Sequence, residues 1–272
     1  MSSITIQELK EIAKKIRQDI IVSTAEAGSG HIMSSLSTVE ILVSLYYKVM
    51  KHYPGNPGSP DRDRFVLSKG HAAPALYSVM AETGYFSVEE LKSLRKIESR
   101  LQGHPVSHRL PGLDSSSGSL AQGISISVGM AIAGKLDNKS YRVYALLGDG
   151  ECQEGEVWEA AMAAAHFKLD NLTAIIDMNE LQSDGKTEDI MSLGSLKKKW
   201  ASFGWKVFEV NGHDFNALLG AFKKAKNIKT HPTVIIAKTI KGSGVSFIEG
   251  NLKYHSAPLN KDELKAALEE LR

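Results

Sequence analysis

The chain has 272 residues, a length that fits one large α/β domain over residues 1–272 with little left over. Its 33 Lys and Arg against 31 Asp and Glu give a net charge of +2, which excludes a sequence-wide field for nucleic acid or anionic membranes. The single cysteine, Cys152, excludes an internal disulfide framework and a cysteine-rich zinc site. Residues 1–15 are polar and charged and lack the pattern of a secretory signal, so we expect a soluble, cytoplasmic protein.

The first elements that the sequence predicts are helices. Apolar residues at helical spacing over 6–20 predict an amphipathic helix that ends at the Gly-Ser-Gly stretch 28–30. Ser37 and Glu40 match the capping-box pattern and predict a second helix that runs to about Met50.

Loops then separate a short strand from the next helix. The apolar run 65–67 predicts a strand, and the capping-box pair Ser87 and Glu90 predicts a helix to about residue 97. The stretch 102–119 is rich in Gly, Pro and Ser and predicts a long ordered loop, which in a compact domain is usually functional.

The second half of the chain alternates strands with helices. The predicted strands cover residues 143–147, 172–176, 206–210 and 233–237, and the predicted helices cover 157–167 and 215–226. This alternation predicts an α/β fold, a parallel sheet with helices on both faces. Ligands of such sheets bind beyond the carboxyl ends of the strands.

Gly148-Asp149-Gly150 follows one predicted strand and Asn179 follows the next. Neighbouring parallel strands would bring Asp149 and Asn179 side by side. With the backbone carbonyl of Leu181 they would supply half of an octahedral Mg²⁺ shell, which a diphosphate would complete. A plain turn remains the alternative interpretation.

The wider sequence around this pair resembles the transketolase family. The similar motifs occur in the family's order, at 68–72, 103–105, 117–123, 148–160 and 255–259. The resemblance implies a thiamine-diphosphate-binding fold. It covers only the N-terminal part of the long transketolases, and it matches the N-terminal subunit of a split transketolase.

The resemblance also implies roles for individual residues. Asp149, Asn179 and the Leu181 carbonyl would hold the divalent metal, Mg²⁺ or alternatively Ca²⁺ or Mn²⁺. The cofactor-binding residues implied with Asp149 and Asn179 are His71, Gly118, Leu120, Gly150 and Glu151. The catalytic residues implied are His31, His104 and His255, which would surround the thiazolium, and Glu154, which would join a proton-linked network at a subunit interface.

The implied reaction moves a two-carbon glycolaldehyde unit from a ketose phosphate to an aldose phosphate in the pentose phosphate pathway. In this family the pyrimidine-binding domain lies beyond the similar region, so we expect the chain to be inactive alone. It would work as an α2β2 heterotetramer with a C-terminal transketolase subunit. We expect sugar phosphates as the small-molecule partners, and neither nucleic acid nor a membrane.

The sequence predicts structural roles for several other residues. We expect Asp177 to be structural, Cys152 to be a small buried side chain, and the lysines of 197–199 to be solvated. Five further histidines are predicted to be solvated: His52, His108, His166, His213 and His231.

Other functions remain open on the sequence alone. One is a different thiamine diphosphate enzyme, either a transketolase for an unusual pentulose phosphate or a deoxyxylulose-phosphate-synthase type. Another is a non-catalytic diphosphate-binding scaffold. A P-loop or Rossmann nucleotide site is disfavoured, because neither glycine motif follows a predicted strand.

Overall fold

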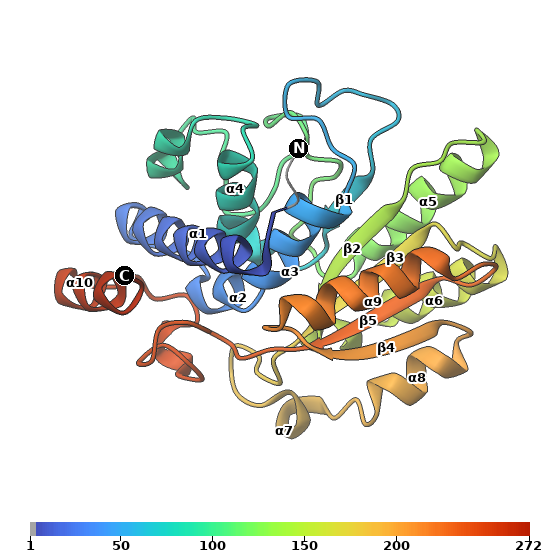
Figure 1. The fold of residues 1–272 in the computed structure, drawn as a ribbon. Helices are drawn as coiled ribbons and strands as arrows, with labels where there is room; N and C mark the ends of the chain where they lie inside the picture. The colour runs from blue at the N-terminus through green and yellow to red at the C-terminus, as the bar shows by residue number, and fades with distance from the viewer. Residues whose placement is uncertain (1–3) are drawn as a thin grey trace.

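The structure, a computed structural model, describes residues 4–272. A five-stranded sheet lies at its centre, with every neighbouring pair parallel and the order β1-β2-β3-β5-β4 (Figure 1). The strands are β1 (Arg64–Leu67), β2 (Val143–Gly148), β3 (Leu172–Met178), β4 (Lys206–Asn211) and β5 (Thr233–Lys238). The predicted parallel α/β sheet is therefore confirmed.

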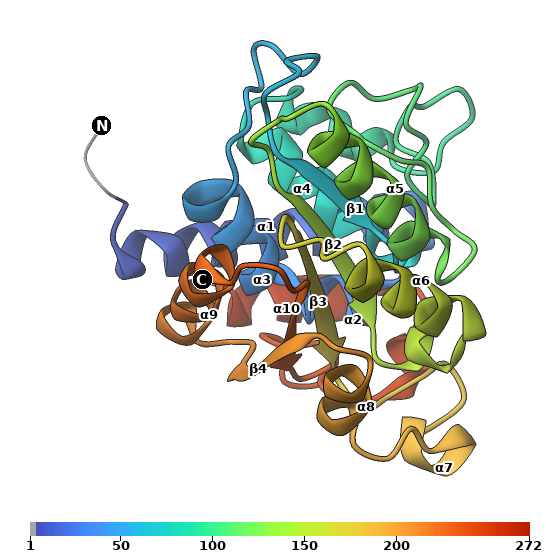
Figure 2. The same cartoon turned by 90° about the vertical axis from the view of Figure 1, so that its right-hand side faces the viewer.

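Helices cover both faces of this sheet (Figures 1 and 2). They are α1 (Ile6–Ala27), α2 (Ile32–Leu36), α3 (Val39–Ser44), α4 (Ala73–Glu82), α5 (Gln122–Leu136), α6 (Gly155–His166), α7 (Thr187–Met191), α8 (Leu196–Ser202), α9 (Phe215–Asn227) and α10 (Lys261–Glu270). Within residues 4–272, no helix has both the length and the apolar composition needed to cross a bilayer.

Successive residues of the strands face two different apolar clusters, as the two-residue period of a strand requires. In β2, Tyr144 and Leu146 join the cluster formed with α1 to α4 and α9. Ala145 and Leu147 join the cluster formed with α5, α6 and α8. Because both faces of β2 and β3 are covered, these strands are apolar runs rather than alternating ones.

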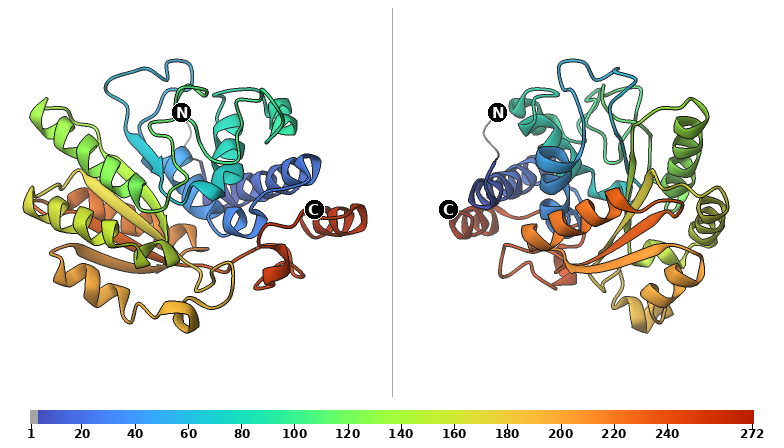
Figure 3. Two further views of the ribbon diagram at one scale, coloured as in Figure 1. Left: turned by 180° about the vertical axis from the view of Figure 1, so that it is seen from behind. Right: turned by 45° about the vertical axis from the view of Figure 1, so that its right-hand side comes forward.

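The first predicted helix is confirmed at both ends. A capping box between Thr5 and Glu8 begins α1, and Gly28, with φ of +62°, ends it in the left-handed region. The C-terminal helix α10 packs against α1 (Figures 1 and 3).

Two capping-box interactions are absent at the predicted caps, although the helix predicted from Ser37 to about Met50 is confirmed by α3 and by the π-helix Leu45–Val49 that continues it. Ser37 lies between α2 and α3, and its hydroxyl donates to the carboxylate of Asp177 at 2.7 Å, so a buried tertiary contact replaces the local cap. After Ser87 the chain forms a 3-10 helix, Val88–Ser93, which is shorter than predicted. It ends there because Leu94 is extended and Arg95 has φ of +59°.

Register explains how the sheet positions the residues of interest. Gly148 at the end of β2 pairs with Asp177 near the end of β3. Asp149 and Asn179 therefore leave the sheet at the same edge, one strand apart. The chain turns that follow β1 and β5 open at this edge as well, because all the strands run in one direction.

Candidate active site

The loops at the carboxyl edge of the sheet surround a cavity of about 470 Å³. This is the place where the fold predicts a ligand. The cavity is lined by all of the predicted site residues: His31, His71, His104, Gly118, Leu120, Asp149, Gly150, Glu151, Glu154, Asn179, Leu181 and His255. The structure thus brings together residues that are up to 224 positions apart in the chain.

Asp149 is only 4% exposed and accepts three hydrogen bonds from its own neighbourhood. Gly150 N donates to one oxygen at 2.9 Å, and Glu180 N at 2.7 Å and the Thr187 hydroxyl at 3.4 Å donate to the other. Burial, and next the charge of Asp177, raise the pKa of Asp149 to about 6. A cation placed at this carboxylate would offset the cost of burying its charge.

A side chain at Gly150 would displace the side chain of Gln182. A Cβ there would lie 2.8 Å from Nε2 of Gln182, which is closer than van der Waals contact allows. The glycine therefore lets the turn after β2 approach the loop that follows β3.

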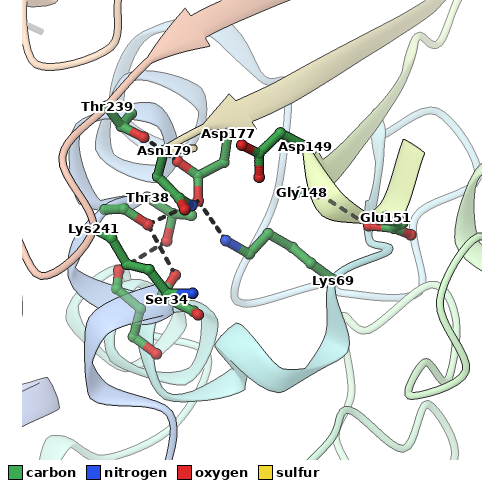
Figure 4. A network of polar contacts seen from close by, with 12 residues as sticks. Ser34, Thr38, Lys69, Gly148, Asp149, Glu151, Asp177, Asn179, Thr239 and Lys241 are labelled. Atoms are coloured by element: carbon green, nitrogen blue, oxygen red, sulfur yellow. Dashed lines mark hydrogen bonds and ion pairs between the residues drawn. The ribbon is translucent and has the colours of Figure 1, made fainter. Parts of the chain in front are cut away.

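Asn179 and Leu181 also line the cavity, and Figure 4 shows Asn179 beside Asp177. Nδ2 of Asn179 donates to Oδ2 of Asp177 at 3.0 Å, and its Oδ1 accepts from Leu181 N at 3.2 Å. The Leu181 carbonyl accepts from Nζ of Lys241 at 2.7 Å. The three predicted metal ligands thus lie on one wall, and one of them already contacts a cationic group.

Three imidazoles cluster on another side of the cavity. The ring centroid of His31 lies 5.1 Å from that of His71 and 5.3 Å from that of His255. Burial lowers the pKa of His31 and of His255 to about 4, and lowers that of His71 well below 6.5. All three are therefore neutral at pH 7. Within residues 4–272, Nδ1 of His31 and of His255 is buried without a hydrogen-bond partner.

His104 and Gly118 pack together in the long loop predicted at 102–119. A Cβ at Gly118, whose φ is +156°, would lie 3.4 Å from Cγ of His104. Burial lowers the pKa of His104, so this imidazole is also neutral at pH 7. The loop therefore adds a fourth neutral imidazole to the cavity.

Glu151 uses both carboxylate oxygens within the protein. The Ser68 hydroxyl and Ala121 N, the latter at 2.8 Å, donate to Oε1, and Gly148 N donates to Oε2 at 3.0 Å. The side chain joins the segments after β1 and β2 to the start of α5. Glu154, by contrast, is exposed at the start of α6.

Three polar residues of this region were missed by sequence reasoning about ligands. Lys69, which lines the cavity, forms a buried ion pair with Asp177, and Thr239 donates to the same carboxylate (Figure 4). Lys241 reaches the cavity from the loop after β5. Burial, and next the charge of Lys69, lower the pKa of Lys241 to about 8, so it is still mostly charged at pH 7. Lys69 could have been found because it lies within the motif at 68–72 that resembles the family. For Lys241 the only indication in the sequence is that it follows a predicted strand.

The structural roles predicted for Asp177 and Cys152 agree with their complete burial. Two of the histidines predicted to be solvated are instead hydrogen-bonded and partly buried. His213 contacts Glu40 at 2.9 Å and Ile240 N at 2.8 Å, and His52 contacts the Tyr46 carbonyl at 2.6 Å. For His213 the prediction fails because Glu40 comes from a distant segment of the chain, whereas the Tyr46 carbonyl lies only six residues before His52.

Comparisons with known proteins agree with this geometry. Residues 8–271 match the family model described as "Transketolase, thiamine diphosphate binding domain". The chain is 43% identical over 264 residues to "6-deoxy-6-sulfo-D-fructose transketolase subunit SqwG" of Clostridium sp. (strain MSTE9), covering 97% of this chain and 96% of that protein. It is 42% identical over 272 residues to an apulose-4-phosphate transketolase subunit of Actinobacillus succinogenes, covering 99% of this chain and 98% of that protein.

Full-length transketolases match over less than half of their own length. Human transketolase is 44% identical over 267 residues, which are 98% of this chain and 42% of that protein. The crystal structure of transketolase from Campylobacter jejuni superposes with a TM-score of 0.93 at 36% identity, covering 98% of this chain and 43% of that one. The chain belongs to the transketolase family and corresponds to its thiamine diphosphate-binding domain.

Proposed function

We propose that this chain is the N-terminal subunit of a two-chain transketolase, which moves a two-carbon ketol unit from a ketose to an aldose with thiamine diphosphate. The observation that carries the proposal is one cavity in which four neutral imidazoles accompany Asp149, Asn179 and the Leu181 carbonyl. Imidazoles suit contacts with sugar hydroxyls, and the oxygen donors suit a divalent cation that binds a diphosphate.

The residues present fit such a cation. Within residues 4–272 there is no cluster of three His, Cys, Asp or Glu side chains that could hold a metal. The ion would instead take one carboxylate oxygen of Asp149, Oδ1 of Asn179 and the Leu181 carbonyl, all hard oxygen donors that suit Mg²⁺, Ca²⁺ or Mn²⁺. The buried carboxylate of Asp149, whose pKa is raised to about 6, supports the site, because a bound cation would offset the cost of burying its charge.

The diphosphate would lie between this cation and Lys241. Gly150 would contact it through the backbone, His71 would donate to one of its oxygens, and Lys241 would supply a second positive charge. Bound thiamine diphosphate supplies the carbon nucleophile and the electron sink for breaking a carbon–carbon bond.

His31, His104 and His255 would act on the sugar. Because each is neutral at pH 7, each can donate from one ring nitrogen and accept at the other. Nδ1 of His31 and of His255 is buried, so a sugar hydroxyl would contact these rings through Nε2. These contacts would orient the ketose and hold or return a proton at its hydroxyl oxygens.

The partner would be a C-terminal transketolase subunit in an α2β2 assembly. Both relatives of similar length carry the word subunit in their names, which supports a two-chain enzyme. They are also named for uncommon sugars, 6-deoxy-6-sulfo-D-fructose and apulose 4-phosphate. We therefore propose an uncommon ketose with an anionic end as the substrate, in place of the pentose phosphate pathway sugars expected from the sequence.

The test is transfer from each of three sugars to an aldose phosphate by the chain co-purified with a C-terminal transketolase subunit. The sugars are 6-deoxy-6-sulfo-D-fructose, apulose 4-phosphate and xylulose 5-phosphate. We expect activity only in the mixture, highest with one of the first two sugars, and its loss in His31→Ala and His104→Ala. A product that depends on pyruvate would refute transketolase activity, and full activity in both variants would favour a scaffold.

A further inference from the structure

Three polar side chains outside the cavity form one continuous chain of contacts. Nη2 of Arg17 in α1 donates to both oxygens of Glu40 in α3, at 2.7 and 2.9 Å. Oε2 of Glu40 also lies 2.9 Å from Nδ1 of His213, which comes from the turn between β4 and α9. Arg17 and Glu40 are each only 7% exposed, so this cluster is held inside the fold.

His213 and Arg17, the two ends of this cluster, both form hydrogen bonds with the loop after β5. Nε2 of His213 accepts from the amide of Ile240 at 2.8 Å, and Nε of Arg17 donates to the carbonyl of Ser243 at 2.9 Å. Lys241 lies between these two contacts. Since the amide of Ile240 can only donate, Nε2 of His213 is unprotonated, and its Nδ1–H donates to Glu40.

The other contacts of the loop beside Lys241 are mainly backbone hydrogen bonds, among them Gly250 N to the Lys241 carbonyl at 2.9 Å. The side chain of Ile240 is 49% exposed and gives no apolar anchor. Gly242 has φ of +87° and donates to the Met33 carbonyl, and Gly244 has φ of +101°. A Cβ at Gly244 would lie 2.5 Å from Nε of Arg17, so the guanidinium and the loop fit together only because this residue is glycine.

We propose that Glu40 is a positioning residue, which through Arg17 and His213 holds the Ile240–Ser243 loop so that the ammonium of Lys241 lies beside the Leu181 carbonyl. Arg17, Glu40 and His213 together form the Lys241 clamp. This inference rests on the proposed function, because the diphosphate is the group that the positioned ammonium would contact. The clamp contacts the backbone on either side of Lys241, at Ile240 and at Ser243.

The first test is independent of any ligand. Hydrogen exchange of the segment that contains the Ile240 amide is measured in the wild-type chain, His213→Ala, His213→Gln and Glu40→Gln. We expect exchange to rise about tenfold or more in His213→Ala, because the amide loses its acceptor. Oε1 of the glutamine can accept in place of Nε2, so His213→Gln should restore part of the protection. His231→Ala, at the opposite end of the sheet, is the control; unchanged exchange in His213→Ala would overturn the clamp.

The second test measures binding of inorganic pyrophosphate with Mg²⁺ to the full chain by calorimetry. We expect Lys241→Met and His213→Ala each to weaken binding about tenfold, the lower end of the effects of outer-shell residues. The double variant should be no weaker than Lys241→Met alone, because His213 would act only through Lys241. The inference would be overturned if the losses of affinity in the two single variants multiplied in the double variant. It would also be overturned if His213→Ala bound pyrophosphate as tightly as the wild-type chain. A wild-type chain that binds no pyrophosphate would instead count against the proposed function, while the exchange data still decide on the clamp.

Discussion

Nδ2 of Asn179 donates to Oδ2 of Asp177 at 3.0 Å, and this hydrogen bond determines which way the Asn179 amide faces. A carboxylate can only accept, so the NH₂ group must point to Asp177 and Oδ1 must point away from it. Oδ1 is the atom proposed to bind the metal. Asp177 therefore orients Asn179 as a metal ligand, although it is not a proposed ligand itself. The ammonium of Lys69 balances the charge of the Asp177 carboxylate.

The first prediction separates the hydrogen bond of Asp177 from its charge. In a Lys69→Met background, Asp177→Asn retains an acceptor for Asn179, whereas Asp177→Ala leaves the amide free to rotate. We expect the alanine variant to require about 10 to 100 times more Mg²⁺ for pyrophosphate binding, as removal of an outer-shell partner does elsewhere. The asparagine variant is the reference, because Lys69→Met alone would leave the Asp177 carboxylate buried without its counter-charge.

The Lys69→Met background matters because an unpaired buried ammonium would destabilise the fold by about 3 to 5 kcal/mol. Titration calorimetry at several Mg²⁺ concentrations gives the apparent affinities of the alanine and asparagine variants in this background. Equal Mg²⁺ requirements in the alanine and asparagine variants would show that Asp177 does not orient Asn179.

The second prediction concerns pH. The pKa of Asp149 is raised to about 6 by burial and next by Asp177, and only its ionised form binds a cation. Once corrected for the protonation of pyrophosphate itself, Mg²⁺-dependent binding should fall toward tenfold per pH unit below pH 6, and it should weaken again above about pH 8, where Lys241 loses its proton. His31 and His255, with pKa values of about 4, stay neutral over this range and do not contribute. Binding that stays constant down to pH 5 would contradict the assignment of Asp149.

The same shift predicts an effect on stability in the absence of a cation. The folded-state pKa of Asp149 lies above its ordinary value of 3.8, so protonation of this group stabilises the fold. Its contribution is full below about pH 4 and is lost as the pH rises through about 6. When the pH is lowered from 7 to 5, the free energy of unfolding should increase more in the wild-type chain than in Asp149→Ala. Denaturant titrations of both proteins at both pH values measure this difference. With saturating Mg²⁺ and pyrophosphate this gain should disappear.

The sequence allowed the sheet to be predicted because its information is local. β2 and β3 are short apolar runs followed by Gly148-Asp149 and by Asn179, and the parallel arrangement brings Asp149 and Asn179 to one edge, as the register of β2 and β3 confirms. The motif histidines also reached the cavity together.

The contacts of Ser37, His213 and Lys241 could not be predicted, because they join segments that are far apart in the sequence. Ser37 has the spacing of a helix cap, but it donates to Asp177, which lies 140 residues away. His213 stands in a polar turn and was predicted to be solvated, yet its partner Glu40 is 173 residues away. Lys241 has no local pattern at all, because the Leu181 carbonyl that it contacts belongs to another loop. The spacing of residues along the sequence predicts a single helix or strand. Whether these polar groups are buried depends on how several helices, strands and loops pack together.

The last prediction uses two glycines of α5 that differ only in their surroundings. A Cβ at Gly123 would lie 2.6 Å from Cα of Ser68, in the segment after β1, whereas a Cβ at Gly129 would meet nothing within 4 Å. Gly123→Ala should therefore lower the free energy of unfolding by about 1 to 3 kcal/mol, because backbone must move to relieve the contact. Gly129→Ala should raise it by about 0.5 to 1 kcal/mol, because alanine favours the helix.

Denaturant unfolding of both variants beside the wild-type chain measures these changes. Ser68 donates to Glu151, so displacement of the Ser68 backbone by Gly123→Ala should also disturb the turn at Gly148 and weaken pyrophosphate binding. Gly129→Ala should bind as the wild-type chain does. If the two variants were equally stable and bound equally well, the close contact between α5 and the segment after β1 would not exist in solution, and the link from Glu151 to the cavity would be lost with it.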